Sequence, residues 1–264
     1  MKQTLHSIVF IGAGNVATHL AQAFARCGCL VCQIFSRTED SARTLAEQVG
    51  CPYTTSTGSI ISGADLYIVA VKDAVLESLI PQITARSPQS LFVHTAGSMP
   101  MDVWKGHAAR HGVMYPMQTF SKRRPVDFSA IPFFIEANNA ADAGLLKELA
   151  GRISGNIHEA TSEQRRYLHI AAVFACNFTN RMYAICEHLL KANGLPFEAM
   201  LPLIDETARK VHHLSPAEAQ TGPACRYDEN VISRHLQMLS DEPELAQIYE
   251  LISKSIHHSM KKEQ

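Results

Sequence analysis

The sequence has no long run of apolar residues and almost no net charge. No apolar stretch in its 264 residues approaches the roughly 20 that a membrane-spanning helix needs. The formal charge is −1 and charged residues make up 19% of the chain, so nothing predicts binding to nucleic acid or to a membrane surface. The N-terminal apolar run, residues 8–11, is too short for a signal peptide. We therefore expect a cytoplasmic protein.

The chain also lacks a cysteine pattern that would predict a metal site or a disulfide framework. Its seven cysteines are an odd number, which favours free thiols in a reducing compartment. Cys27, Cys29 and Cys32 form a C-x-C-x-x-C motif. They enter a predicted strand, however, where neighbouring side chains point to opposite faces and cannot converge on one ion. We expect small buried hydrophobic cysteines and no metal site.

The clearest pattern in the sequence is a strand, a glycine loop and a helix near the N-terminus. Residues 8–11 predict a strand buried on both faces, and a G-x-G-x-x-A loop follows before an amphipathic helix. Gly12 permits the tight turn, Gly14 leaves room for a pyrophosphate, and Ala17 lets the helix lie close to the strand. The helix N-terminus offers free N–H groups to phosphates. The predicted dinucleotide contacts in this loop are Gly12, Ala13, Gly14, Asn15 and Val16.

The end of the second predicted strand, residues 30–35, lacks the acidic residue that would bind the ribose of NAD. Ser36, Arg37 and Thr38 stand there instead. The arginine supplies a planar fork for a 2′-phosphate, and the hydroxyl groups can add donors. This pattern favours NADP over NAD, although Arg37 could also be a solvated surface residue.

Further strands and helices alternate to about residue 160, which predicts a doubly wound α/β sheet in a domain spanning 1–160. The expected strands are 52–54, 65–71, 90–93, 112–115, 131–136 and 153–159, and the expected helices are 39–49, 74–84 and 139–153. Asp73 is predicted to cap the helix 74–84. Ligands bind at the carboxyl ends of such strands. The candidate cofactor contacts there are Val71, Lys72, His94, Thr95, Ala96 and Gly97, with Ser98 facing the substrate. His94 could instead be a core histidine.

From Thr161 the pattern becomes helical, which predicts an all-α domain spanning 161–264. Thr161 and Gln164 form a capping box, and the helix is expected to continue to residue 192. Its middle, residues 168–178, is apolar nearly all round, so we expect it to be buried. At about 100° per residue, His169, Asn177 and Asn180 share one side of this helix. They could bond to neighbouring helices or form a polar stripe facing the substrate.

Helices are also expected at 196–213, kinked at Pro202, at 228–239 with Asp228 as its cap, and at 243–258. Thr221, Gly222 and Pro223 interrupt the helical pattern. Glycine and proline at that place predict either a loop that closes over a ligand or a plain turn between helices.

Five segments together resemble a bacterial family of two-domain proteins, with a Rossmann-like NADP-binding domain and a helical C-terminal domain of unknown function. They are GAGNVATHLA, HTAGS, YPMQTFS, HIAAVFACNFTN and TGPACRYD, at 12–21, 94–98, 115–121, 169–180 and 221–228. Wider relatives include pyrroline-5-carboxylate reductases, deazaflavin-dependent NADP reductases and β-hydroxyacid dehydrogenases. The resemblance implies that substrate binds between the sheet and the first long helix of the second domain.

One position departs from the β-hydroxyacid dehydrogenases. Their catalytic lysine lies four residues before an asparagine, and the residue four before Asn177 is Val173, which cannot transfer a proton. His169 is the nearest titratable replacement.

Taken together, the sequence predicts an NADP-dependent oxidoreductase that transfers hydride to or from a small carbonyl or imine. His169 would be the acid, Asn177 and Asn180 would orient the substrate, and the Thr221–Gly222–Pro223 loop would close over it. The alternative is a dinucleotide-binding sensor without turnover. Because a long apolar helix needs cover, we also expect a homodimer joined through the helical domain.

Overall fold

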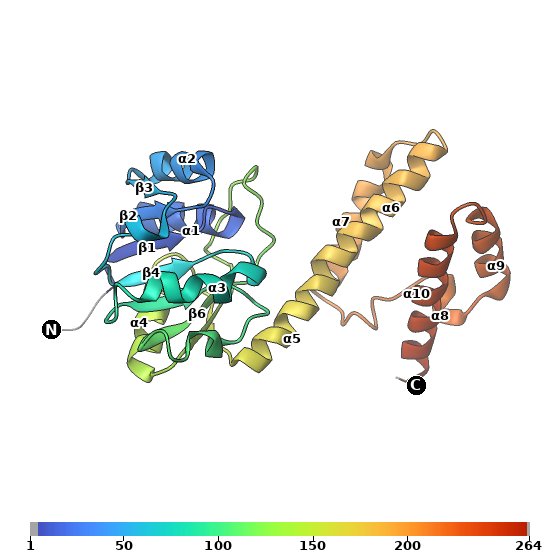
Figure 1. The fold of residues 1–264 in the computed structure, drawn as a ribbon. Helices are drawn as coiled ribbons and strands as arrows, with labels where there is room; N and C mark the ends of the chain where they lie inside the picture. Colours follow the sequence, from blue (N-terminus) through green and yellow to red (C-terminus); the bar gives the residue numbers. More distant parts are fainter. Residues whose placement is uncertain (1–4, 263–264) are drawn as a thin grey trace. The chain divides into compact units, whose positions relative to one another are not determined.

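A computed structural model describes residues 5–262 of the chain, and within that range an eight-stranded sheet forms the centre of the N-terminal part (Figure 1). The strand order is β3-β2-β1-β4-β5-β6-β7-β8. Every pair is parallel except β6 with β7. The strands are β1 (Ser7–Ile11), β2 (Leu30–Phe35), β3 (Tyr53–Thr54), β4 (Leu66–Val69), β5 (Leu91–His94), β6 (Arg110–Pro116), β7 (Phe133–Ala137) and β8 (Ile157–Glu159).

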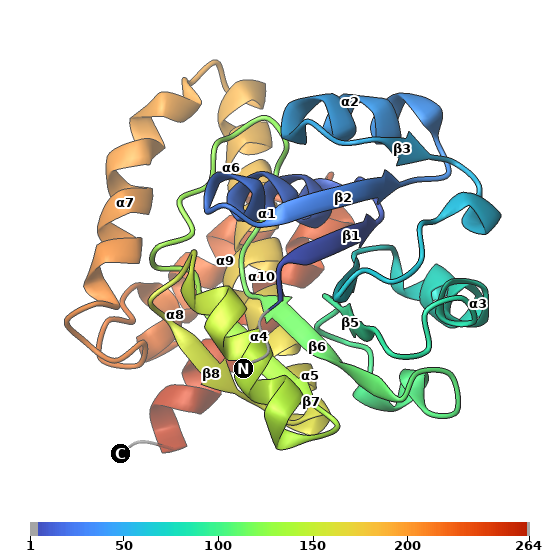
Figure 2. The same ribbon diagram turned by 90° about the vertical axis from the view of Figure 1, so that its left-hand side faces the viewer.

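The sheet is covered on both faces, which is why its central strands are continuous apolar runs. Helices α1 (Asn15–Arg26), α2 (Glu39–Val49) and α4 (Ala140–Gly151) contribute to one apolar cluster. Helix α3 (Asp73–Thr84) and the 3₁₀ turn η2 (Met101–Trp104) contribute to the other. Strands β1 and β2 lie side by side in the sheet (Figure 2). The predicted doubly wound α/β sheet is confirmed.

Two predictions about helix starts are wrong in detail. Lys72 occupies the cap position of α3, and Asp73, which was expected to cap it, is already the first helical residue. Pro202 does not kink a helix. It lies in the first turn of α7 (Leu201–Lys210), where a proline costs no hydrogen bond, after the 3₁₀ turn η4 (Phe197–Met200).

The long helical segment begins as predicted and contains an irregularity that was not predicted. Thr161 accepts a hydrogen bond from the backbone N–H of Gln164, and the Gln164 side chain accepts one from Thr161, which completes the capping box of α5 (Ser162–Ala172). A π-helical segment, Val173–Phe178, then separates α5 from α6 (Thr179–Ala192). The wider π turn changes the phase of the following residues, so a constant angle per residue does not hold across it.

The predicted burial of residues 168–178 is wrong for the single chain. Ile170, Phe174 and Phe178 are 53%, 63% and 49% exposed. The residues are apolar as the sequence indicates, but an apolar pattern does not say whether the same chain buries it.

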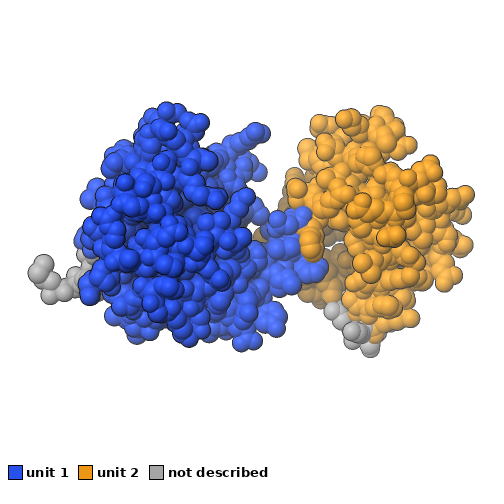
Figure 3. Space-filling model, viewed as in Figure 1, with its two compact units in different colours: residues 1–177 blue, residues 178–264 orange. Residues whose placement is uncertain are grey.

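The chain divides into two compact units, residues 1–177 and 178–264 (Figure 3). This division falls inside the π-helical segment, whereas the sequence pattern changes at residue 161. In the second unit, α10 (Pro243–Lys262) contacts α8 (Pro223–Arg226) and α9 (Glu229–Met238) around a small core. The Asp228 side chain caps α9 as predicted. No helix among residues 5–262 is long and apolar enough to cross a membrane.

Candidate NADP site and adjoining cavity

The glycine loop has the geometry that a phosphate group needs. Gly12 has a φ of +116°, and a Cβ at this position would lie 2.3 Å from the carbonyl oxygen of Ala70, so only glycine fits. Gly14 is the N-cap of α1, and a Cβ there would meet nothing within 4 Å, which leaves the approach to the helix N-terminus open. The first turn of α1 has no acidic residue that would repel an anion.

The structure brings the glycine loop together with the end of β2 and the end of β4 around one cavity of about 180 Å³. The predicted contacts that line it are Gly12, Ala13, Gly14, Ser36, Arg37, Val71 and Lys72. Thr38 is the N-cap of α2, and its hydroxyl lies 3.5 Å from that of Ser36. Glu39 and Asp40 fall in the first turn of α2, where they interact with Tyr53 and Arg43. Arg37 is therefore the charged group at the end of β2 that lines this cavity.

Asn15 and Val16 open helix α1, and Asn15 is used in a contact that the sequence did not predict. Its Nδ2 donates a hydrogen bond of 2.9 Å to the carbonyl oxygen of Phe120. The ring of His19 lies 2.9 Å from the carbonyl oxygen of Ser121. These contacts hold the end of the YPMQTFS segment beside the glycine loop.

The turn after β5 shows two different environments. The His94 side chain is fully buried, stacks with Trp104 at 6.2 Å between ring centroids, and accepts a hydrogen bond at Nδ1 from the Ala96 N–H. Burial, with the charge of Arg165 adding to it, lowers the pKa of His94 to about 3. This favours the core-histidine alternative for His94. Ser98 donates a hydrogen bond to the carboxylate of Asp73.

Gly97 lies against two ring side chains that come from different elements. A Cβ at Gly97 would lie 2.9 Å from Nδ1 of His169 on α5 and 2.9 Å from Cζ of Tyr115 on β6. The hydroxyl of Tyr115 is 3.4 Å from the same Nδ1. Glycine is therefore the residue that lets the turn, the phenol and the imidazole meet.

Tyr115 and His169 line a cavity of about 350 Å³ formed by residues of the first unit. Cys176 and Asn177 line it from the π-helical segment, and Gln118 and Thr119 line it from the segment after β6. Burial raises the pKa of the Tyr115 phenol, opposed by the positive charge of Arg165. The phenol is thus protonated at neutral pH and can donate a proton.

Other predicted residues lie elsewhere. Asn180 belongs to the second unit, as do Thr221, Gly222 and Pro223. Gly222 has a φ of +104° and is the N-cap of the short helix α8, which begins at Pro223. Whether this loop closes over a ligand stays a prediction.

Sequence reasoning missed Tyr115 and Arg165 as site residues. Tyr115 falls within a motif that had been noted, but no charge or spacing distinguished its phenol. Arg165 reads as one of several polar residues in the first turns of α5, yet it is 0% exposed. Only the structure shows that its guanidinium enters the core and pairs with Glu136.

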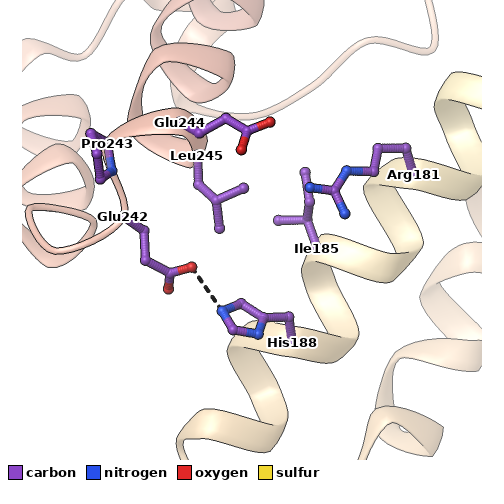
Figure 4. Close-up of a pocket in the computed structure, with 7 residues that line it drawn as sticks. All are labelled: Arg181, Ile185, His188, Glu242, Pro243, Glu244 and Leu245. Atoms are coloured by element: carbon purple, nitrogen blue, oxygen red, sulfur yellow. Dashed lines mark hydrogen bonds and ion pairs between the residues drawn. The ribbon is translucent and has the colours of Figure 1, made fainter.

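A third cavity, of about 510 Å³, lies in the second unit (Figure 4). Arg181, Ile185 and His188 of α6 face Leu245 and its neighbours at the start of α10, and His188 lies 2.7 Å from the Glu242 carboxylate. None of the predicted site residues lines it. Among residues 5–262 no group of three histidine, cysteine or acidic side chains is arranged to hold a metal ion.

Comparisons with known proteins agree with this geometry. A family model described as NADP oxidoreductase, coenzyme F420-dependent, matches residues 7–97. A domain of unknown function, DUF2520, matches residues 131–256. A search of curated proteins found no match.

Solved structures extend the likeness to nearly the whole chain. A protein from Bacteroides fragilis assigned as an NADP oxidoreductase is 56% identical, with a TM-score of 0.92 and coverage of 96% of this chain and 98% of that one. An imine reductase from Myxococcus stipitatus in complex with NADP⁺ is 15% identical, with a TM-score of 0.66 and coverage of 97% and 93%. A pyrroline-5-carboxylate reductase from Coxiella burnetii is 16% identical, with a TM-score of 0.60 and coverage of 98% of both chains. The last two likenesses concern the fold.

The open glycine loop, Arg37 beside it and the near-complete match at 56% identity lead to one assignment. The chain belongs to the family of NADP oxidoreductases that join a Rossmann-type NADP-binding domain to a helical C-terminal region containing the DUF2520 domain.

Proposed function

We propose that the protein transfers hydride between NADP(H) and a small carbonyl or imine compound bound in the cavity beside Tyr115 and His169. The observation that carries this proposal is the meeting of Gly97, Tyr115 and His169 at the carboxyl end of β5. In an open parallel sheet that end is where ligands bind, and the glycine loop lies at the same edge. A proton donor therefore adjoins the cofactor site.

The residues of this chain supply binding and proton transfer. When bound, NADPH supplies a hydride to the carbon of the C=O or C=N bond. The oxygen or nitrogen of that bond then needs one proton, which Tyr115 or His169 donates. Arg37 and the glycine loop bind the phosphates, and the side chain of Asn177 orients the substrate without adding charge.

The lining of the cavity indicates the kind of substrate. Its polar groups are the hydroxyl, amide, imidazole and thiol groups of Tyr115, Thr119, Gln118, Asn177, His169 and Cys176, and most of the remaining surface is apolar. Such a lining suits a small molecule that is recognised through a few hydrogen bonds. Seven free cysteines fit a reducing compartment such as the cytoplasm.

We also propose that the working form is a homodimer joined through the helical region. No residue from 166 to 223 is buried in the single chain, although this stretch contains most of α5, all of α6 and α7, and many apolar residues. Helices in globular proteins derive most of their stability from packing of an apolar face. A second copy of the chain would supply that packing.

The alternative function is a sensor that binds NADP(H) without turnover. An enzyme and a sensor differ in whether a titratable group lies within reach of the reacting atoms, and the Tyr115–His169 pair supports the enzyme.

The test is a screen of NADPH oxidation against ketoacids, aldehydes, imines and a deazaflavin. Consumption of NADPH with one class, and its loss in a Tyr115→Phe/His169→Ala double variant, is the expected result. Tight NADPH binding with no oxidation by any acceptor would favour the sensor.

A further inference from the structure

A buried arginine on α5 connects the turn after β5 to α5 and to β7. Arg165 is 0% exposed, and its Nε and Nη2 donate to the carbonyl oxygens of Ala96 and Met99, at 3.3 and 2.6 Å. Its Nη1 donates to the carboxylate of Glu136 on β7. The planar guanidinium presents its donors in a fixed fork, so it sets the distance between the two carbonyl groups that flank Gly97 and Ser98.

A serine completes this arrangement from the same helix. The Ser162 hydroxyl donates to Glu136 at 2.7 Å and accepts the N–H of Met101 at 2.8 Å. The backbone N–H of Ser162 also donates to Glu136, at 3.0 Å. The first turn of α5 is thereby joined to both ends of the segment from Ala96 to Met101.

Arg165 and His169 are four residues apart on α5, and side chains at that spacing lie on one face of a helix. Both contact the same turn, since a Cβ at Gly97 would collide with the His169 ring. The arginine therefore determines where the turn lies relative to the imidazole and to the phenol of Tyr115. A small displacement of this turn would misplace any ring that is bound against it.

We propose that Arg165 is a positioning residue, which holds the Ala96–Met99 turn at the place where the nicotinamide half of NADP(H) meets His169 and Tyr115. This inference rests on the proposed function only for the identity of the group that the turn faces. The hydrogen bonds of Arg165 go to Ala96, Met99, Glu136 and Ser162. None of these residues belongs to the phosphate-binding loop or lies beside Arg37, so the effect of Arg165 should be confined to one half of the cofactor.

The experiment compares two ligands by calorimetry, with no need for turnover. NADPH occupies the whole site, whereas adenosine 2′,5′-bisphosphate carries the 2′-phosphate but no nicotinamide. In Arg165→Ala we expect NADPH affinity to fall about tenfold, because the turn beside the nicotinamide loses its charge-assisted hydrogen bonds, and the bisphosphate affinity to stay unchanged. Guanidinium ion should restore NADPH affinity, and urea, which has a similar shape but no charge, should not. Arg166→Ala, which changes the exposed neighbouring arginine, is the matched control.

Arg165→Lys covers the case in which the alanine variant does not fold. It keeps a charge beside Glu136 but cannot reach both carbonyl groups, so the same split between the two ligands is expected. Equal weakening of both ligands would mean a general structural role, and unchanged NADPH affinity in the lysine variant would mean that the fork is not needed. Either result overturns the proposal. A failure to find any hydride acceptor would count against the proposed function and leave this comparison intact.

Discussion

At the scale of the residue, Arg37 lies at the end of β2 in the cavity beside the glycine loop. Its guanidinium can pair with the 2′-phosphate that distinguishes NADP from NAD. We expect Arg37→Asp to remove most of the preference for NADPH over NADH, an effect of about 1.5–3 kcal/mol for a charge-assisted contact. Calorimetry with both cofactors measures it.

Arg43→Asp is a suitable control, because Arg43 is a nearby arginine that pairs with Asp40 on the surface. Its replacement should leave the preference nearly unchanged. Equal affinity of the unmodified protein for NADPH and NADH would contradict the role given to Arg37.

The Tyr115–His169 pair leads to a prediction about rate. His169→Ala should leave NADPH affinity intact and raise the barrier of any turnover found by roughly 3–5 kcal/mol if proton transfer is lost. Tyr115→Phe tests whether the phenol is the donor.

The pH dependence separates the two donors. A phenol donor is active while it is protonated, and burial raises the pKa of Tyr115 above its ordinary 10. Reduction through Tyr115 should therefore persist through neutral and mildly alkaline pH, whereas donation by an imidazolium declines near neutrality. A rate that falls with rising pH around neutrality would show that the phenol of Tyr115 is not the proton donor.

Residues of the glycine loop could be predicted because their roles depend on local backbone geometry. Gly12, Gly14 and Arg37 are adjacent to strands whose apolar runs are clear in the sequence. Arg165 and Tyr115 could not be predicted as site residues, because their roles depend on contacts with residues more than fifty positions away in the sequence.

At the scale of the element, Asp65 joins the neighbouring central strands β1 and β4. It precedes β4, and its carboxylate accepts the N–H groups of His6 and Ser7 and the Ser7 hydroxyl, all at the start of β1. Asp65→Asn should lower the free energy of unfolding by about 1–3 kcal/mol, because three donors, two of them partly buried, lose a charged acceptor. Urea unfolding at neutral pH measures this loss.

The sign of the pH effect follows from the pKa of Asp65. Burial alone would raise it, but the hydrogen bonds from Ser7 and His6 outweigh burial and lower it below the ordinary 3.8. The stabilisation is therefore present above that ordinary value and is lost as the pH falls through the lowered one. The difference between wild type and Asp65→Asn should shrink in that acid range. Asp102→Asn, which removes only a surface ion pair, should show no such change.

Elements with strong local signals matched their predicted bounds, and α5 with its continuation did not. Strand β2 and helix α2 have the predicted limits because an apolar run and a glycine end determine them. The π-helical segment has no signal in residue type, so the expected alignment of His169 with Asn180 rested on a regular helix that the chain does not form.

At the scale of the whole molecule, the exposed apolar residues predict self-association. Leu203 on α7 is 61% exposed, and it belongs to a stretch in which nothing is buried. We expect light scattering at micromolar concentration to show a dimer, and Leu203→Asp to shift it towards the monomer. Leu30→Asp, at a position 63% exposed at the start of β2, is the matched control and should remain dimeric. A monomeric wild-type protein would refute the prediction.

The sequence could not show whether the apolar helix is covered by its own chain. Residue type and period report that a face avoids water, and they carry no information about which molecule provides the cover. The same limit applies to the cavity proposed to bind substrate, which is lined by side chains brought together from β6, α5 and the π-helical segment.

Among the seven free thiols, Cys176 is the exposed one, and it lines the same cavity as Tyr115 and His169. A thiol at that position could capture small molecules that fit the cavity and so indicate the kind of substrate. A library of small disulfides exchanged against Cys176 would enrich fragments whose shape and polarity match the cavity, and Cys176→Ser would report capture at the other thiols. Mass spectrometry of the intact protein would then identify ligands by their added mass, before any reaction has been observed.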